Sequence, residues 1–144
     1  MIEVQNIIKS FDGTEIIKGV STVFDKGKTN LIIGQSGSGK TVFLKCLLSL
    51  FIADSGKILF EGKGLKKMSI KERSILRQEM GMVFQGSALF DSMNVEENIM
   101  FPMQMFTQKD DDEIRDRANL VIKRVNLINA NSKYPDEISG GMKK

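Results

Sequence analysis

The feature that most restricts what this 144-residue chain can fold into is a glycine-rich octapeptide, GQSGSGKT, at residues 34–41. An apolar run at residues 31–33 precedes it, and a second apolar run begins at Val42. Glycines let the backbone turn tightly, so that successive N–H groups point at one centre and can bind a phosphate at a helix N-terminus. We therefore expect a strand over 29–33, a phosphate-binding loop and a helix over 41–50.

The octapeptide matches the P-loop pattern G-x-x-x-x-G-K-[ST] at every fixed position. In this pattern Lys40 reaches the terminal phosphates of a nucleotide, and the hydroxyl of Thr41 binds Mg²⁺. The plainer alternative is a flexible Gly/Ser loop with a chance lysine, but average composition produces this pattern in only about one chain in 200 of this length. The expected nucleotide-binding residues are Gly34, Gln35, Ser36, Gly37, Ser38, Gly39, Lys40, Thr41 and Val42.

Composition excludes several other kinds of protein. Apolar residues make up 41% of the chain, enough for one substantial core, and 21 basic residues mixed with 18 acidic ones give no reason to expect nucleic acid as a partner. The chain has no histidine, which removes Ser-His-Asp chemistry and most zinc sites. The lone Cys46 cannot form an internal disulfide, no leader opens the chain, and no apolar stretch approaches the roughly 20 residues that span a bilayer. We expect an intracellular protein whose membrane attachment, if any, comes through a partner.

Around the loop, short apolar runs and turn residues predict a sheet with an antiparallel start. Ser69 and Glu72 have the spacing of a capping box, which predicts a helix to about residue 80. Strands are predicted at residues 2–9, 15–18, 20–24, 57–60 and 81–84.

The last third of the chain reads as helical. Asn94 and Glu97 predict the start of one helix, which Pro102 should kink or end. A second helix is expected over 110–125, because acidic residues open it and its apolar residues share one face. Those residues are Ile114, Ala118, Val121, Ile122 and Val125.

Three further features accompany the P-loop: Phe11 in a strand ahead of it, GMVFQ at 81–85, and ISGGM at 138–142. With these features the chain resembles, from its first strand to its last residue, the N-terminal part of an ATP-binding subunit of an ABC transporter. No Asn-Lys-x-Asp guanine reader follows the loop, which argues against a GTPase. Without the resemblance, each feature has a plainer interpretation. Phe11 could be a core residue at the end of a strand, Gln85 could be an ordinary amide in a loop, and residues 139–141 could form a turn.

The resemblance assigns a role to each of these residues. It implies that Phe11 stacks on adenine, and that Gln85 contacts Mg²⁺ and the attacking water. It also implies that Ser139, Gly140 and Gly141, the family's signature sequence, bind the γ-phosphate held by the second subunit of a head-to-tail dimer. Ile138 and Met142 replace the usual Leu and Gln of that signature. ATP and Mg²⁺ are the implied cofactors.

The implied fold is α/β, with a P-loop NTPase (RecA-like) core, an N-terminal antiparallel β subdomain and part of a helical subdomain, incomplete in this chain. We expect the β subdomain and P-loop core over about 1–84. The loop that begins with Gln85 (the family's Q-loop), the helical subdomain and the signature are expected over about 85–144. The implied partners are a second ATP-binding subunit and a transmembrane permease, which would hold the protein at the cytoplasmic face of the membrane. The Met-rich residues 93–106 are either core between helices or a groove for a permease helix.

Within the family, the motif sequences most resemble those of the Mla/Mce-type ATPases of bacterial lipid transport. The pointers are the loop from Gly34 to Val42, the run 84–92, residues 98–102 and Met142. Lipid transport is therefore expected, with amino acid or organic solvent export left open.

Hydrolysis in this family also needs an aspartate that ends a strand, a following glutamate and a switch histidine, all beyond the signature. The chain ends at Lys144 without them, and Glu61, which follows an apolar strand, lies only 21 positions after Lys40 and leads into a turn. We expect the longer parent to hydrolyse ATP and this chain to bind it without turnover, and to self-associate through exposed apolar edges. The alternatives are a nucleotide-binding regulatory or structural module, or another P-loop NTPase.

Overall fold

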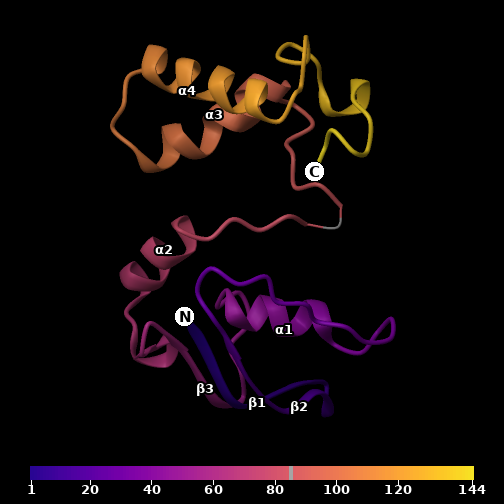
Figure 1. Ribbon diagram of the computed structural model, residues 1–144, viewed down its shortest axis with the longest axis vertical. Coiled ribbons are helices and arrows are strands. Elements are labelled where there is room, and N and C mark those ends of the chain that lie inside the picture. Colours follow the sequence, from indigo (N-terminus) through magenta and orange to yellow (C-terminus); the bar gives the residue numbers. More distant parts are fainter. Residues whose placement is uncertain (85) are drawn as a thin grey trace. The chain divides into compact units, whose positions relative to one another are not determined.

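The computed structural model of the chain describes residues 1–84 and 86–144. It forms two compact units, Met1–Gly81 and Met82–Lys144. Figure 1 shows the strands and α1 in the first unit and the helices α3 and α4 in the second. Each unit has its own buried side chains and is described by itself.

The first unit is built on a four-stranded antiparallel sheet with the order β2-β1-β3-β4. Its strands are β1 (Ile2–Phe11), β2 (Thr14–Phe24), β3 (Ser55–Phe60) and β4 (Lys63–Gly64). A tight turn at Asp12 and Gly13 joins β1 to β2, so that Ile2 lies opposite Phe24, and on its other side β1 pairs Val4 with Ile58 of β3. The predicted antiparallel start of the chain is confirmed.

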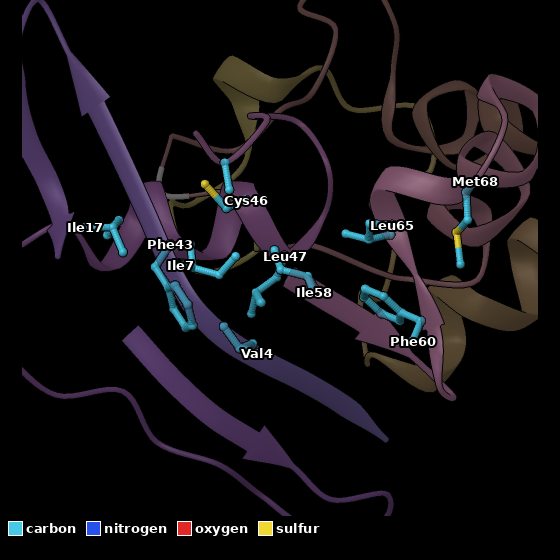
Figure 2. Close-up of a cluster of buried hydrophobic side chains, with 11 residues drawn as sticks. Val4, Ile7, Ile17, Phe43, Cys46, Leu47, Ile58, Phe60, Leu65 and Met68 are labelled. Atoms are coloured by element: carbon cyan, nitrogen blue, oxygen red, sulfur yellow. The ribbon is translucent and has the colours of Figure 1, made fainter. Parts of the chain in front are cut away.

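One face of this sheet is covered by the helix α1 (Lys40–Leu47), which follows the glycine-rich loop. Apolar side chains from β1, β2 and β3 meet the buried face of α1, and Leu65 of the short 3₁₀ helix η1 (Leu65–Lys67) and Met68 close the end of the cluster (Figure 2). Cys46 belongs to this core with 1% of its surface exposed, and burial raises the pKa of its thiol. The labelled members are Val4, Ile7, Ile17, Phe43, Cys46, Leu47, Ile58, Phe60, Leu65 and Met68.

The helix α2 (Ile70–Gln78) is fastened to the edge of the sheet at its first turn. The predicted capping box is present: the Ser69 N–H donates to Glu72 Oε2 (2.7 Å), and the Glu72 N–H donates to Ser69 Oγ (3.2 Å). The ammonium of Lys63 on β4 also donates to Glu72 Oε1 at 2.5 Å. This hydrogen bond, together with those from Ser69, lowers the pKa of Glu72 to about 2.

The second unit packs α3 (Val95–Phe106) against α4 (Asp111–Arg124), and the 3₁₀ helix η2 (Pro135–Glu137) follows. The predicted cap of α3 is present, since the side chain of Asn94 accepts a hydrogen bond from the Glu97 N–H. The helix α4 begins where expected, and the Asp110 side chain caps it by accepting a hydrogen bond from the Glu113 N–H. Ile114 and Ala118 of α4 are buried against Met100 of α3. A second cluster joins Val95, Ile122, Ala130 and Ile138.

Two predicted strands are wrong for the described residues. Residues 29–33 and 81–84 are extended chain without strand hydrogen bonding. A strand needs a neighbour for its N–H and C=O groups, and the described sheet offers none to either segment. Consequently Leu31 and Ile33 are 84% and 82% exposed, although their sequence reads as a buried strand.

Four boundaries also differ from expectation. The predicted strands 15–18 and 20–24 are one strand, since β2 continues through Gly19 with a register shift, and α1 ends at Leu47 rather than near residue 50. Of the two effects predicted for Pro102, a kink or an end of the helix, the end does not occur: Pro102 lies inside α3, whose Met100 and Met103 pack with α4. Val125 is 60% exposed because α4 ends at Arg124.

In the part of the chain that the structure describes, no helix has the length and apolar character needed to cross a membrane.

Candidate functional site

The glycine-rich loop closes on itself through a turn and a lysine. The Ser38 N–H donates to the carbonyl of Gln35 at 3.2 Å. The ammonium of Lys40, the first residue of α1, reaches back and donates to the carbonyls of Gly34 (2.8 Å) and Gln35 (2.7 Å). A positive charge therefore lies across the loop, held by the loop's own backbone oxygens.

Gly39 sets the point at which the loop becomes helix. It is the N-cap of α1 and has φ of 90°, a left-handed conformation that side chains rarely adopt. A Cβ at this position would lie 3.0 Å from side-chain carbons of both Ile16 and Ile17 and 3.1 Å from the Ile16 carbonyl oxygen. The loop thus rests directly on β2, and a side chain at this position would be both crowded and strained.

The N-terminus of α1 leaves backbone N–H groups available to an anion. The first turn of a helix has N–H groups with no partner inside the helix, and no side chain among the described residues caps α1. The first turn also carries no acidic residue, so its positive potential is not offset locally. The earliest helical bond recorded there runs from the Phe43 N–H to the Gly39 carbonyl at 2.8 Å.

Gly34 lies close to Ser38 across the loop. A Cβ at Gly34 would lie 2.8 Å from Ser38 Oγ, whereas a Cβ at Gly37 would meet nothing within 4 Å. Two open hollows of about 420 Å³ each lie between the loop and β2: one is also lined by residues 30–33 and 38–40, and the other by Gly37 and Ser38. Gln35, Ser36 and Thr41 are exposed, so the Thr41 hydroxyl is accessible to a metal ion bound to phosphate.

The predicted adenine-stacking residue Phe11 packs against another aromatic side chain of the first unit. Phe11 is 39% exposed, and its ring packs edge-on against Phe51 (centroids 5.3 Å apart), with the Lys9 ammonium 5.1 Å from the Phe11 centroid. Neither hollow beside the loop has Phe11 in its lining. Gln85 lies outside the described residues. In the described residues no group of three or more His, Cys, Asp or Glu side chains could hold a metal ion.

The signature residues form a separate, exposed turn in the second unit. Ser139 begins it: the Lys143 N–H donates to the Ser139 carbonyl (3.1 Å), and the Met142 N–H donates to Ser139 Oγ (3.4 Å). The flanking Ile138 is buried and Met142 is half-buried in the core of this unit, whereas Ser139, Gly140 and Gly141 are exposed. Ile138 and Met142, the two residues that differ from the usual signature, therefore anchor the turn in the core, and Ser139, Gly140 and Gly141 between them face solvent.

Ile16 and Ile17 are the positions that the sequence did not reveal as parts of the site. They were predicted only as strand residues, but they form the surface on which Gly39 rests. No local pattern signals this contact, because it joins residues 22 or more positions apart.

A glycine loop that ends in an uncapped helix N-terminus and holds a lysine at its mouth is the phosphate-binding arrangement of P-loop NTPases. Comparison with known families gives the finer assignment. The sequence model described as "ABC transporter" matches residues 17–144, and the chain belongs to this family.

Curated relatives support the same assignment. A probable ribonucleotide transport ATP-binding protein, mkl, of Mycobacterium leprae is 40% identical over 143 residues, covering 99% of this chain and 41% of that protein. The methionine import ATP-binding protein MetN of Clostridium tetani is 36% identical over 144 residues, covering 100% of this chain and 45% of that protein. The chain thus spans less than half the length of these relatives.

Solved structures confirm the fold class, an α/β P-loop cassette with an antiparallel sheet and helices. One is a dimeric post-hydrolysis state of the ATP-binding cassette MJ0796 bound to ADP and Pi, with a TM-score of 0.88 and 24% identity, covering 99% of this chain and 65% of that chain. Another is cbiO1 from Clostridium perfringens, described as part of the ABC transporter complex cbiONQ, with a TM-score of 0.83 and 28% identity, covering 99% and 57% of the two chains.

The contact of Gly39 with β2 predicts the effect of adding one methyl group. Gly39→Ala should lower the free energy of unfolding by about 1–3 kcal/mol, because the new Cβ meets Ile16 and Ile17 in a left-handed backbone. Gly81→Ala is the matched control, since Gly81 lacks a positive φ and has no neighbouring atom within 4 Å of a Cβ. Urea denaturation measures both. Equal midpoints for the two variants would show that β2 does not support the loop.

Proposed function

We propose that this chain binds ATP with Mg²⁺ through residues 34–41 and serves as the ATP-binding part of an ABC transporter. The observation that carries the proposal is the Lys40 ammonium held over the loop by the Gly34 and Gln35 carbonyls, beside an uncapped helix N-terminus. These groups place a cation and backbone donors around one small space, as phosphate binding requires.

Each residue of the loop has a role in this proposal. The backbone N–H groups of 37–41 donate to phosphate oxygens, and the Lys40 ammonium moves from the two carbonyls to the β- and γ-phosphates. The Thr41 hydroxyl, with Gln85 from the Q-loop, holds Mg²⁺, which neutralises phosphate charge. Phe11 stacks on adenine, and its 39% exposure leaves part of the ring open to a base.

The activity of the longer protein is a further part of the proposal. We infer that two such subunits bind ATP between them, with exposed Ser139, Gly140 and Gly141 of one contacting the γ-phosphate on the other. Hydrolysis would use an aspartate, a glutamate and a histidine that this 144-residue sequence does not supply after the signature. A transmembrane permease would hold the subunits at the cytoplasmic face of the membrane, with Met105 and Phe106, about 60% exposed, available for contact.

For the cargo we propose lipids, as in Mla/Mce-type systems. The support is the resemblance in residues 34–42, 84–92 and 98–102 and at Met142. The names of the two relatives point instead to ribonucleotides and methionine for those proteins, and these are the competing cargoes.

Replacing the loop lysine tests the nucleotide site. Lys40→Ala should weaken ATP binding by about 10- to 100-fold, because charge-assisted hydrogen bonds to phosphate are lost. Lys45→Ala, on the same helix but facing the Phe51 ring, is the control and should bind ATP as the unaltered chain does. Isothermal titration calorimetry with Mg-ATP measures both. Undiminished binding by Lys40→Ala would overturn the assignment.

The cargo can be tested on the longer protein purified with its permease in detergent micelles, to which phospholipid, methionine or a ribonucleotide is added separately. If lipid is the cargo, phospholipid should stimulate ATP hydrolysis, whereas methionine and ribonucleotides should not. Stimulation by either small molecule alone would exclude the lipid proposal.

A further inference from the structure

The excess of basic over acidic residues in this chain is concentrated in one segment. Residues 57–73 contain six basic and two acidic residues, which leaves 15 basic and 16 acidic residues for the rest of the chain. The segment covers the end of β3, β4, η1 and the first turn of α2. The net positive charge of the protein is therefore a local property of this edge of the sheet.

Four of these lysines line a single hollow. It has a volume of about 540 Å³ and lies between the β3 residues 56–59 and the β4–η1 residues 62–67. Its lining includes Leu59 and the buried Ile58 together with four lysines, Lys57, Lys63, Lys66 and Lys67. Long lysine side chains of this kind place their apolar stems along the hollow and their ammonium groups in solvent.

Only one of the four lysines has an acidic partner. Lys63 pairs with Glu72, whereas Lys57, Lys66 and Lys67 have no carboxylate within 4 Å in the described chain. The bond from Lys63 to Glu72 also places the first turn of α2 beside the hollow. On that turn stand Lys71 and Ile70, which is 82% exposed. Unpaired lysines on a segment that also exposes an isoleucine resemble the surfaces of proteins that lie on anionic membranes.

We propose that this lysine edge, defined as Lys57, Lys63, Lys66, Lys67, Ile70 and Lys71, docks on an anionic lipid surface. The phosphate groups of the lipids meet the ammonium groups, and Ile70 enters the boundary between headgroups and acyl chains. A simpler role, in which edge lysines only prevent strand pairing, explains the charge but not the exposed Ile70 beside it. The proposal goes beyond nucleotide binding and stands or falls independently of it.

Vesicle sedimentation tests the proposal on this chain. It should bind vesicles of equal parts phosphatidylglycerol and phosphatidylcholine, and not vesicles of phosphatidylcholine alone. NaCl at about 1 M, where the Debye length is about 3 Å, should release it. Equal binding to both vesicle types, or none to either, would overturn the proposal.

Two sets of variants locate the contact. Lys57→Gln, Lys66→Gln and Lys67→Gln together should lower the partition onto anionic vesicles about 100-fold, since each lysine near such a surface contributes about a factor of five. The charge-matched control is Lys109→Gln, Lys123→Gln and Lys133→Gln together, at exposed residues of the second unit. It should have little effect on the partition onto anionic vesicles. Ile70→Ser should lower binding about tenfold, and Ile128→Ser, at a residue 73% exposed, should not. Equal effects of the edge and control sets would contradict the site.

A last measurement separates membrane lipid from free phosphate. Calorimetry with inorganic phosphate should detect no binding that depends on Lys57, Lys66 and Lys67. Phosphate binding that disappears in the triple variant would identify a site for a free anion, and the membrane proposal would then be wrong.

Discussion

The packing of α1 against the sheet is the interaction on which the rest of the first unit depends. Phe43, Cys46 and Leu47 are buried against Val4, Ile7 and Ile58 (Figure 2), so the axis of the helix is set by apolar contacts. The N-terminus of α1 is then held by Gly39 against Ile16 and Ile17. The direction of the N–H groups at the start of α1, which we propose bind phosphate, is therefore set by a hydrophobic core.

In the second unit, too, buried apolar residues hold a segment whose polar groups are exposed. Ile138 is buried with Val95, Ile122 and Ala130, and Met142 packs against that cluster. Ser139 starts a helical turn between these anchors, and the two glycines after it are exposed. Ile138 and Met142, which stand where the signature usually has Leu and Gln, thus anchor the turn and leave Ser139, Gly140 and Gly141 exposed.

Local signals in the sequence predicted the elements whose stability is local. The capping boxes at Ser69 and Asn94, the start of α4 at Asp110 and the glycine loop all depend on residues within a few positions of each other. The errors fall where distant partners decide the structure. Residues 29–33 read as a buried strand, yet Leu31 and Ile33 are exposed because no described strand pairs with them. The contact of Gly39 with β2 and the lysine-lined hollow likewise depend on tertiary structure, which periodicity does not encode.

The central claim is that the backbone of residues 37–41 holds the phosphates of a nucleotide. Amide NMR of the isotopically labelled chain, titrated with Mg-ADP and then Mg-ATP, tests it most directly. The account predicts that the largest shifts occur at the N–H groups of Gly37, Gly39, Lys40 and Thr41, because these donate to phosphate oxygens. Shifts confined to other residues, or none at saturating nucleotide, would contradict it.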